Sequence, residues 1–115
     1  MTVTIYHNPR CGKSRETLKL LEGRGIRPKV VEYLKTPPDA AELKRILKLL
    51  GLSARQLLRT KEKEYKAAGL DDAGLSEATI IAAMVKHPIL IERPIVISGT
   101  KAALGRPPEA VLKIL

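Results

Sequence analysis

The stretch that decides the fold is TVTIYHNPRCGKSRETLKLLEGRG, which covers residues 2–25. Residues 2–6 alternate between polar and apolar side chains, and this period predicts a β-strand. Residues 7–12 have the composition of a loop. From Lys13 the apolar positions follow a helical period until Gly23 ends it. The stretch therefore predicts a strand, a loop and a helix in that order.

Three further strands are predicted. Lys29–Tyr33 follows the first helix and completes a βαβ unit with parallel strands and a right-handed crossover. Pro94–Ile97 is apolar on both faces, which is typical of a strand in the middle of a sheet, and Lys101–Leu104 can return antiparallel to it. The last helix is predicted after Pro107, and the inner side of this helix is expected to carry Val111, Leu112 and Leu115.

Residues 39–87 lie between the second and third strands and are predicted to be helical. Apolar residues recur there at helical spacing, and Asp39, Ser53 and Ser76 can each cap a helix start. The fold class is α/β: a mixed four-stranded sheet with flanking helices and a helical insertion between strands 2 and 3. Because 115 residues are enough for one core and too few for two ordinary domains, we expect a single domain over residues 1–115.

The chain has a formal net charge of +9, and the excess lies in residues 1–69, with 16 Lys and Arg against 7 Asp and Glu. Such a balance attracts nucleic acids, anionic membranes and small oxyanions. The chain has no Trp, no Phe and three Tyr, so it lacks stacking side chains for single strands. It also has no helix-turn-helix pattern and no zinc-ligand spacing. We therefore expect no specific nucleic-acid binding and no metal.

The longest uncharged apolar stretch, residues 78–85, is far shorter than the ~20 residues of a membrane helix. The N-terminus has neither the basic start nor the long apolar segment of a secretion signal. A single cysteine, Cys11, excludes an internal disulfide. We expect a cytoplasmic monomer that does not bind a membrane.

Cys11 stands where the first loop enters the first helix. Amides at a helix start carry partial positive charge and stabilise a thiolate or an oxyanion. Arg10 and Lys13 flank the cysteine, and His7 can add positive charge or a hydrogen bond. In such surroundings the pKa of a cysteine falls from ~8.5 to about 3.5–7.5. The alternative interpretation is an ordinary buried thiol, since free cysteines are often buried.

The segment Cys11-Gly12-Lys13-Ser14 has the spacing of a redox Cys-x-x-Cys motif with serine in the second place. Since the chain offers no second thiol, a covalent intermediate on Cys11 must be released by an external thiol such as glutathione. Ser14 can either hydrogen-bond the cysteine or simply occupy the first helical turn.

Four separated blocks resemble the glutaredoxin-linked arsenate reductases, and the resemblance covers nearly the whole chain. The blocks are Ile5 to Arg15, Leu57-Leu58-Arg59, His87 to Val96 and Gly105 to Glu109. The chain is more similar to the shorter chromosomal subgroup than to the plasmid-type reductases, which continue past Leu115. The resemblance implies a thioredoxin-like fold with a cis peptide bond before Pro94. His87 is expected to close a helix instead of taking part in catalysis.

The resemblance also implies a role for each matching residue. Cys11 matches the catalytic nucleophile, His7 the histidine that assists its ionisation, and Arg59, Arg93 and Arg106 the arginines around the oxyanion. Substrate binding would also involve Gly12, Lys13 and Ser14. Arginine suits this role because its planar guanidinium binds two oxygens at once and stays charged.

The implied reaction is the reduction of arsenate to arsenite through a thiol-arsenate adduct on Cys11, with glutathione as co-substrate, glutaredoxin as partner and no bound cofactor. One alternative is a glutathione-linked thiol oxidoreductase, which needs Cys11 but not the three arginines. Another is a redox regulator that binds RNA polymerase and shares the fold. Those regulators often carry two cysteines in the Cys-x-x-Cys position, and Ser14 disfavours this alternative.

Overall fold

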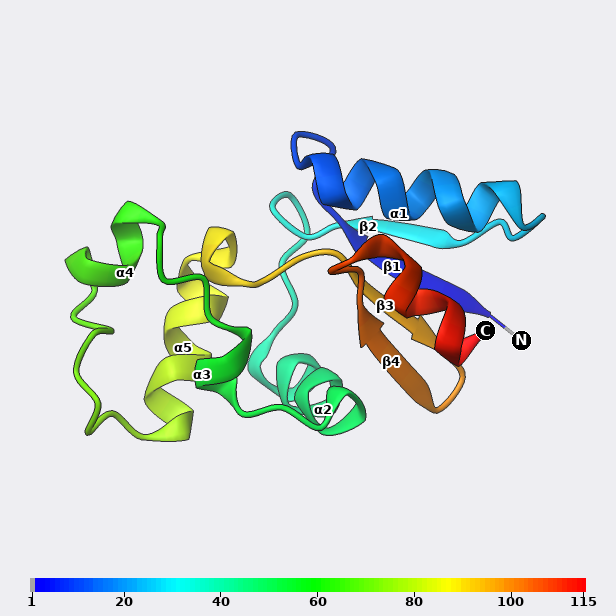
Figure 1. Cartoon of the computed structure of the whole chain (residues 1–115). Helices are drawn as coiled ribbons and strands as arrows, with labels where there is room; N and C mark the ends of the chain where they lie inside the picture. Colours follow the sequence, from blue (N-terminus) through cyan, green and yellow to red (C-terminus); the bar gives the residue numbers. More distant parts are fainter. Residues whose placement is uncertain (1) are drawn as a thin grey trace. The chain divides into compact units, whose positions relative to one another are not determined.

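A computed structural model describes residues 2–115 (Figure 1). The chain forms two compact units. The first contains the residues up to Thr36 together with Arg93–Leu115, and the second contains Pro37–Glu92. The helical insertion expected from the sequence is this second unit. A single domain over the whole chain stays a prediction.

The first unit is built on a four-stranded sheet in the order β2-β1-β3-β4 (Figure 1). Strands β1 (Val3–His7) and β2 (Lys29–Glu32) are parallel, whereas β3 (Ile95–Ser98) is antiparallel to both β1 and β4 (Lys101–Leu104). All four residues of β3 are buried, as its apolar composition predicts for an interior strand. The mixed sheet and the thioredoxin-like fold are therefore confirmed.

The core of the first unit lies between one face of the sheet and two helical segments. Ile5 of β1 faces Val96 of β3 in register, and both are fully buried. Leu21 of α1 (Gly12–Gly23) and Val111 of η2 (Pro108–Ile114) pack into the same cluster. Because α1 is fixed to the sheet in this way, the loop before it has a fixed position above the end of β1.

The last helix differs from the prediction in its type and in one of its inner residues. It is a 3₁₀ helix over Pro108–Ile114, and Leu115 is 46% exposed. In a 3₁₀ helix residues three apart lie on the same side, so Val111 and Ile114 face the core and Leu115 does not. The prediction for Val111 is confirmed, that for Leu115 is wrong, and Leu112 is only partly buried.

The second unit consists of short helices whose starts match the predicted caps. Asp39, Ser53 and Ser76 each accept a backbone N–H at a helix start, and His87 closes α5 as predicted. The helices are α2 (Ala40–Leu50), α3 (Ala54–Leu57), α4 (Lys63–Ala67), α5 (Glu77–Lys86) and the 3₁₀ turn η1 (Pro88–Leu90).

The region that the structure describes, residues 2–115, has no helix that is both long and apolar enough to cross a membrane.

Candidate functional site

Cys11 is the N-cap residue of α1, with φ −93° and ψ 123°. The loop that delivers it is a tight turn, because the Cys11 N–H donates to the Asn8 carbonyl at 3.0 Å and the Arg10 N–H donates to Asn8 Oδ1 at 3.0 Å. Pro9 lies inside this turn, and its carbonyl accepts from Arg15 at 3.0 Å. The turn places a half-buried thiol at the positive end of a twelve-residue helix.

Opposing effects set the acidity of Cys11. Burial raises the pKa of the thiol, whereas the backbone N–H groups of Ser14 and Lys13 and the hydrogen bond and charge of Arg93 lower it. The Cys11 side chain makes no capping hydrogen bond of ordinary geometry, so we expect the two amides to act mainly through their dipoles. The combined result is a pKa below the ordinary value, which confirms the predicted direction.

Two arginines from the C-terminal segment of the first unit lie at the sulfur of Cys11. Arg93 is only 8% exposed and hydrogen-bonds Cys11 through its guanidinium. Arg106 donates from Nη2 to Cys11 Sγ at 3.7 Å and from Nε to the Arg93 carbonyl at 2.8 Å. The site therefore brings two fixed guanidinium groups to one thiol, an arrangement suited to an oxyanion held beside a thiolate.

The Ser14 side chain fixes the loop through hydrogen bonds to His7 and Asn8. Its side chain is fully buried; Oγ lies 2.6 Å from His7 Nδ1 and accepts the Asn8 N–H at 3.0 Å. The hydroxyl therefore connects the end of β1 to the first turn of α1. Of the two roles considered for Ser14, its side chain takes the structural one, and only its backbone N–H acts on the cysteine.

Neither His7 nor Arg10 is among the groups that dominate the pKa of Cys11. Arg10 is exposed and is not among the groups that act on the thiol. The His7 ring contacts Ser14, and burial lowers its pKa, opposed by Glu32 and assisted by Arg15. Burial thus disfavours the charged form of the His7 ring. A role for His7 in ionising Cys11 stays a prediction.

Gly105 allows three segments of the first unit to meet. A Cβ at this position would collide with the Thr17 side chain and would lie 2.6 Å from Pro94 Cγ. Thr17 is fully buried on α1, and the Gly105 N–H donates to the Pro94 carbonyl at 2.9 Å. The peptide bond before Pro94 is cis, as predicted, and that before Pro107 is cis as well. Gly105 therefore sets how closely Arg106, the next residue, approaches α1.

Arg59 lies in the second unit and is bound by two carboxylates. It donates from Nη1 to Glu92 at 2.6 Å and from Nε to Glu62 at 3.2 Å. Its position is fixed by an antiparallel pairing of residues 57–59 with 90–92. Burial lowers the pKa of Arg59, but the carboxylates outweigh this effect and raise it. An oxyanion bound to this guanidinium would have to share it with both glutamates.

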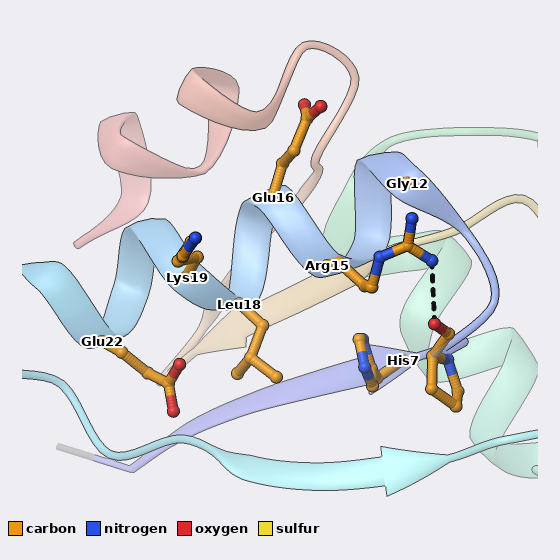
Figure 2. Close-up of a pocket in the computed structure, with 8 residues that line it drawn as sticks. His7, Gly12, Arg15, Glu16, Leu18, Lys19 and Glu22 are labelled. Atoms are coloured by element: carbon orange, nitrogen blue, oxygen red, sulfur yellow. Dashed lines mark hydrogen bonds between the residues drawn. The ribbon is translucent and has the colours of Figure 1, made fainter.

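A cavity of about 540 Å³ opens in the first unit beside the loop (Figure 2). His7, Pro9 and Gly12 line the end next to Cys11, and Leu18 lies further along α1. Four charged residues of α1 complete the lining: Arg15, Glu16, Lys19 and Glu22. Within residues 2–115 no group of three or more His, Cys, Asp or Glu side chains is arranged to hold a metal ion.

The sequence identified Cys11, Arg93 and Arg106, and the structure brings these three together. It places Gly12, Lys13 and Ser14 at the helix start beside them. Sequence reasoning missed Asn8, Thr17 and Gly105 as parts of the same site, and it missed the glutamates that bind Arg59. The glycine before Arg106 was the one available signal, because a glycine next to a functional residue often marks a close backbone approach.

Comparison with known proteins places these residues in a family context. The model of the ArsC family matches residues 6–114. A protein of Haemophilus influenzae named arsenate reductase is 53% identical, and the alignment covers all of both chains. The Escherichia coli protein YfgD, described as uncharacterized, is 59% identical over 98% of this chain and 96% of its own. The structure of an arsenate reductase from Vibrio cholerae superposes with a TM-score of 0.97 at 55% identity, covering 100% of this chain and 98% of that one.

We expect the pKa of the Cys11 thiol to lie below ~8.5, the value of a free cysteine. The rate of iodoacetamide alkylation, measured from about pH 4 to about pH 10, follows the thiolate fraction and should have its midpoint below that value. Arg93→Ala removes a hydrogen bond and a charge and should raise the midpoint. Arg10→Ala is the matched control, and its midpoint should equal that of the parent. Equal shifts in both variants would show that general positive charge, not Arg93, sets the acidity.

We expect Gly105→Ala to disturb the site through crowding, because the added methyl meets Thr17 and Pro94. Overpacking of this kind costs on the order of 1–3 kcal/mol in the free energy of unfolding, measured by urea denaturation. The Cys11 alkylation midpoint should also rise, because displacing Pro94 moves Arg93, the residue before it. Adding Thr17→Ala removes one of the two collisions and should recover part of both losses. Gly23→Ala is the control, since a Cβ at Gly23 has no neighbour within 4 Å. Equal effects of the two glycine variants would refute a special role for Gly105.

Proposed function

The chain belongs to the ArsC family, and we propose that it is an arsenate reductase in which Cys11 is the nucleophile and an external thiol supplies the electrons. The observation that carries this proposal is the pair of guanidinium groups at one acidic thiol. Arg93 lowers the pKa of Cys11, and Arg106 lies 3.7 Å from its sulfur. A thiol oxidoreductase without an anionic substrate has no need for two fixed cations at the sulfur.

Electrostatics explain why both arginines are needed. Arsenate is a multiply charged anion at neutral pH, and a thiolate repels it unless cations lie close to both. Arg93 is buried, so its charge is poorly screened by water and acts strongly on the reacting atoms. Arg106 Nε donates to the Arg93 carbonyl, which holds the Arg106 guanidinium beside the Arg93 backbone. Such preorganised donors stabilise the charge that develops during attack.

The reaction runs through a covalent intermediate. The Cys11 thiolate attacks arsenic, an As–S bond forms, and one arsenate oxygen leaves as water after protonation. Two external thiols are then oxidised to one disulfide, while arsenic goes from As(V) to As(III) and arsenite is released from Cys11. The overall exchange of one arsenate and two thiols gives one arsenite, one disulfide and one water, so atoms and electrons balance. No bound cofactor takes part.

The external thiols are proposed to be glutathione and then glutaredoxin. The only cysteine of the chain is the nucleophile, so the chain cannot resolve its own adduct. We place the protein in the cytoplasm, where such thiols are kept reduced, and we propose that it acts as a monomer. Arg59 is proposed as a third cation for the oxyanion only on the family resemblance; in the second unit its guanidinium is bound by Glu62 and Glu92.

The arsenate proposal and the thiol-oxidoreductase alternative make different demands on the arginines. We expect Arg93→Ala and Arg106→Ala each to lower kcat/KM for arsenate by about 2–4 kcal/mol in transition-state free energy, as the loss of one preorganised donor does. Arg93→Lys should recover only part of the lost kcat/KM for arsenate, because lysine keeps the charge but cannot make the bidentate contact of a guanidinium. The measurement is a coupled assay with arsenate, glutathione, glutaredoxin and NADPH.

Arg24→Ala, at an exposed position at the C-terminal end of α1, is the control and should match the parent. Exchange of Cys11 with a glutathione mixed disulfide involves no oxyanion and should change much less in the arginine variants. If Arg93→Ala and Arg106→Ala both keep arsenate turnover within about threefold of the parent, the oxyanion site is wrong.

A further inference from the structure

Asn8, the residue directly after β1, makes three of the hydrogen bonds that shape the loop. Its carbonyl accepts the Cys11 N–H and its Oδ1 accepts the Arg10 N–H, both at 3.0 Å. Its own N–H donates to Ser14 Oγ at 3.0 Å, and only 4% of the residue is exposed. Asn8 therefore connects the end of β1 both to the turn that carries the nucleophile and to the first turn of α1.

The backbone, and not the side chain, holds Cys11 at its place. An N-cap side chain commonly accepts a backbone N–H of the first helical turn. The Cys11 side chain makes no such bond. Instead its N–H donates to the Asn8 carbonyl, and its carbonyl accepts the Arg15 N–H at 3.0 Å. The turn closed by Asn8 thus positions the nucleophile while the sulfur is left for reaction.

Turn chemistry accounts for the acceptor at position 8 but not for its amide. An aspartate closes a turn of this kind as an asparagine does, and a carboxylate is favoured at a helix start. Three other helices of the chain carry an acid in their first turn: Glu42 in α2, Glu64 in α4 and Glu77 in α5. The first turn of α1 has none. Helix stability therefore gives no reason for an uncharged residue here.

A carboxylate at position 8 would act against the chemistry of Cys11. Oδ1 lies 3.0 Å from the Arg10 nitrogen, and chain geometry puts the Cys11 sulfur within roughly 8 Å of that nitrogen. Because the site is buried, water would screen such a charge poorly. The charge would oppose Arg93 and the helix amides, which lower the pKa of the thiol. It would also repel any anion bound beside the sulfur.

The acids on the elements next to the loop have lysines beside them. Glu16 on α1 lies 3.9 Å from the Lys13 ammonium, and Glu32 on β2 lies 3.6 Å from that of Lys35. Neither glutamate is among the groups that dominate the pKa of Cys11. The surroundings of the nucleophile thus agree with the missing acid in the first turn of α1.

We infer that Asn8 is a positioning residue for the nucleophile: it closes the turn that holds Cys11 at the helix start, and its uncharged amide leaves that helix start to the thiolate and to an anionic substrate. The part that concerns Cys11 stands on the geometry of the loop. The part that concerns the substrate rests on the proposed function, in which the anion is arsenate. Asn8 acts through Cys11 and takes no part in bond making.

One pair of variants separates the charge of residue 8 from its hydrogen bonds. Asn8→Asp keeps an acceptor for the Arg10 N–H and adds a charge, whereas Asn8→Ser keeps a shorter, uncharged acceptor. The readout is the pH midpoint of Cys11 alkylation by iodoacetamide, which is itself uncharged. We expect Asn8→Asp to raise the midpoint by about half a unit to one unit, and Asn8→Ser to stay close to the parent. Equal midpoints in a folded Asn8→Asp and the parent overturn the inference.

Asn8→Ala tests the turn itself, because it leaves the Arg10 N–H without its acceptor. We expect a higher alkylation midpoint than in the parent, since Cys11 is no longer held at the helix start, and Asn8→Ser should restore most of the difference. Urea denaturation reports stability separately. If Asn8→Ala loses stability but keeps the midpoint of the parent, Asn8 is a structural residue only and the inference is wrong.

Thr100→Asp is the matched control for the added charge. Thr100 is exposed in the turn between β3 and β4. Ser98, at the end of β3, pairs with Val3, so this turn lies at the opposite end of β1 from Asn8. Its alkylation midpoint should equal that of the parent. A rise as large as that in Asn8→Asp would show that net charge alone, and not its place beside Cys11, sets the midpoint.

A second site for the charge covers the case in which Asn8→Asp does not fold. Gly12 is the first residue of α1, and the nearest atom to a Cβ there is Arg15 Nη2 at 3.9 Å, so a side chain fits. The midpoint of Gly12→Asp should lie several tenths of a unit above that of Gly12→Asn, its uncharged counterpart. Equal midpoints in the two contradict the inference. Since no alkylation assay contains arsenate, a parent that fails to reduce arsenate overturns the proposed function alone.

Discussion

The structure of the site depends on one electrostatic contact, between the buried guanidinium of Arg93 and the sulfur of Cys11. A charge taken out of water is strongly unfavourable unless an opposite charge compensates it. The thiolate compensates Arg93, and Arg93 in turn lowers the pKa of the thiol. Neither group is suited to its position without the other. The helix start of α1 adds its dipole to the same balance.

Several features of the first unit serve to hold that contact in place. Ser14 fixes the end of β1 to the first turn of α1, and Gly105 lets the segment before Arg106 pack directly on Thr17 and Pro94. Arg106 is attached to the Arg93 carbonyl and so moves with it. The groups of the site therefore occupy separate positions in the first unit. Arg93 and Arg106, on the segments around β3 and β4, lie at the sulfur, the helix start carries Cys11, and His7 of β1 lines a separate cavity.

The sequence predicted most of the fold because the signals were local. Helix caps at Asp39, Ser53 and Ser76 and the strand periods all depend on neighbours within a few residues. The exposure of Leu115 was not predictable, since the same apolar pattern fits an α-helix, and only packing on the sheet selects the 3₁₀ form. The cis bond before Pro107 had no sequence signal, whereas that before Pro94 came from family resemblance.

The sequence predicted most residues of the site, but it did not predict which of them contact one another. Position along the chain made Arg10 and His7 the neighbours of Cys11, yet the groups that act on it include Arg93, which is 82 residues away in the chain. Long-range partners of this kind, including Glu92 for Arg59, are set by strand pairing that no local pattern encodes.

The measurement that tests the central claim most directly is arsenic X-ray absorption of the protein mixed with arsenate and no added thiol. We predict one sulfur bound to arsenic in the parent and only oxygen in Cys11→Ser; arsenic bound only by oxygen in a parent that turns over arsenate would contradict a covalent intermediate on Cys11.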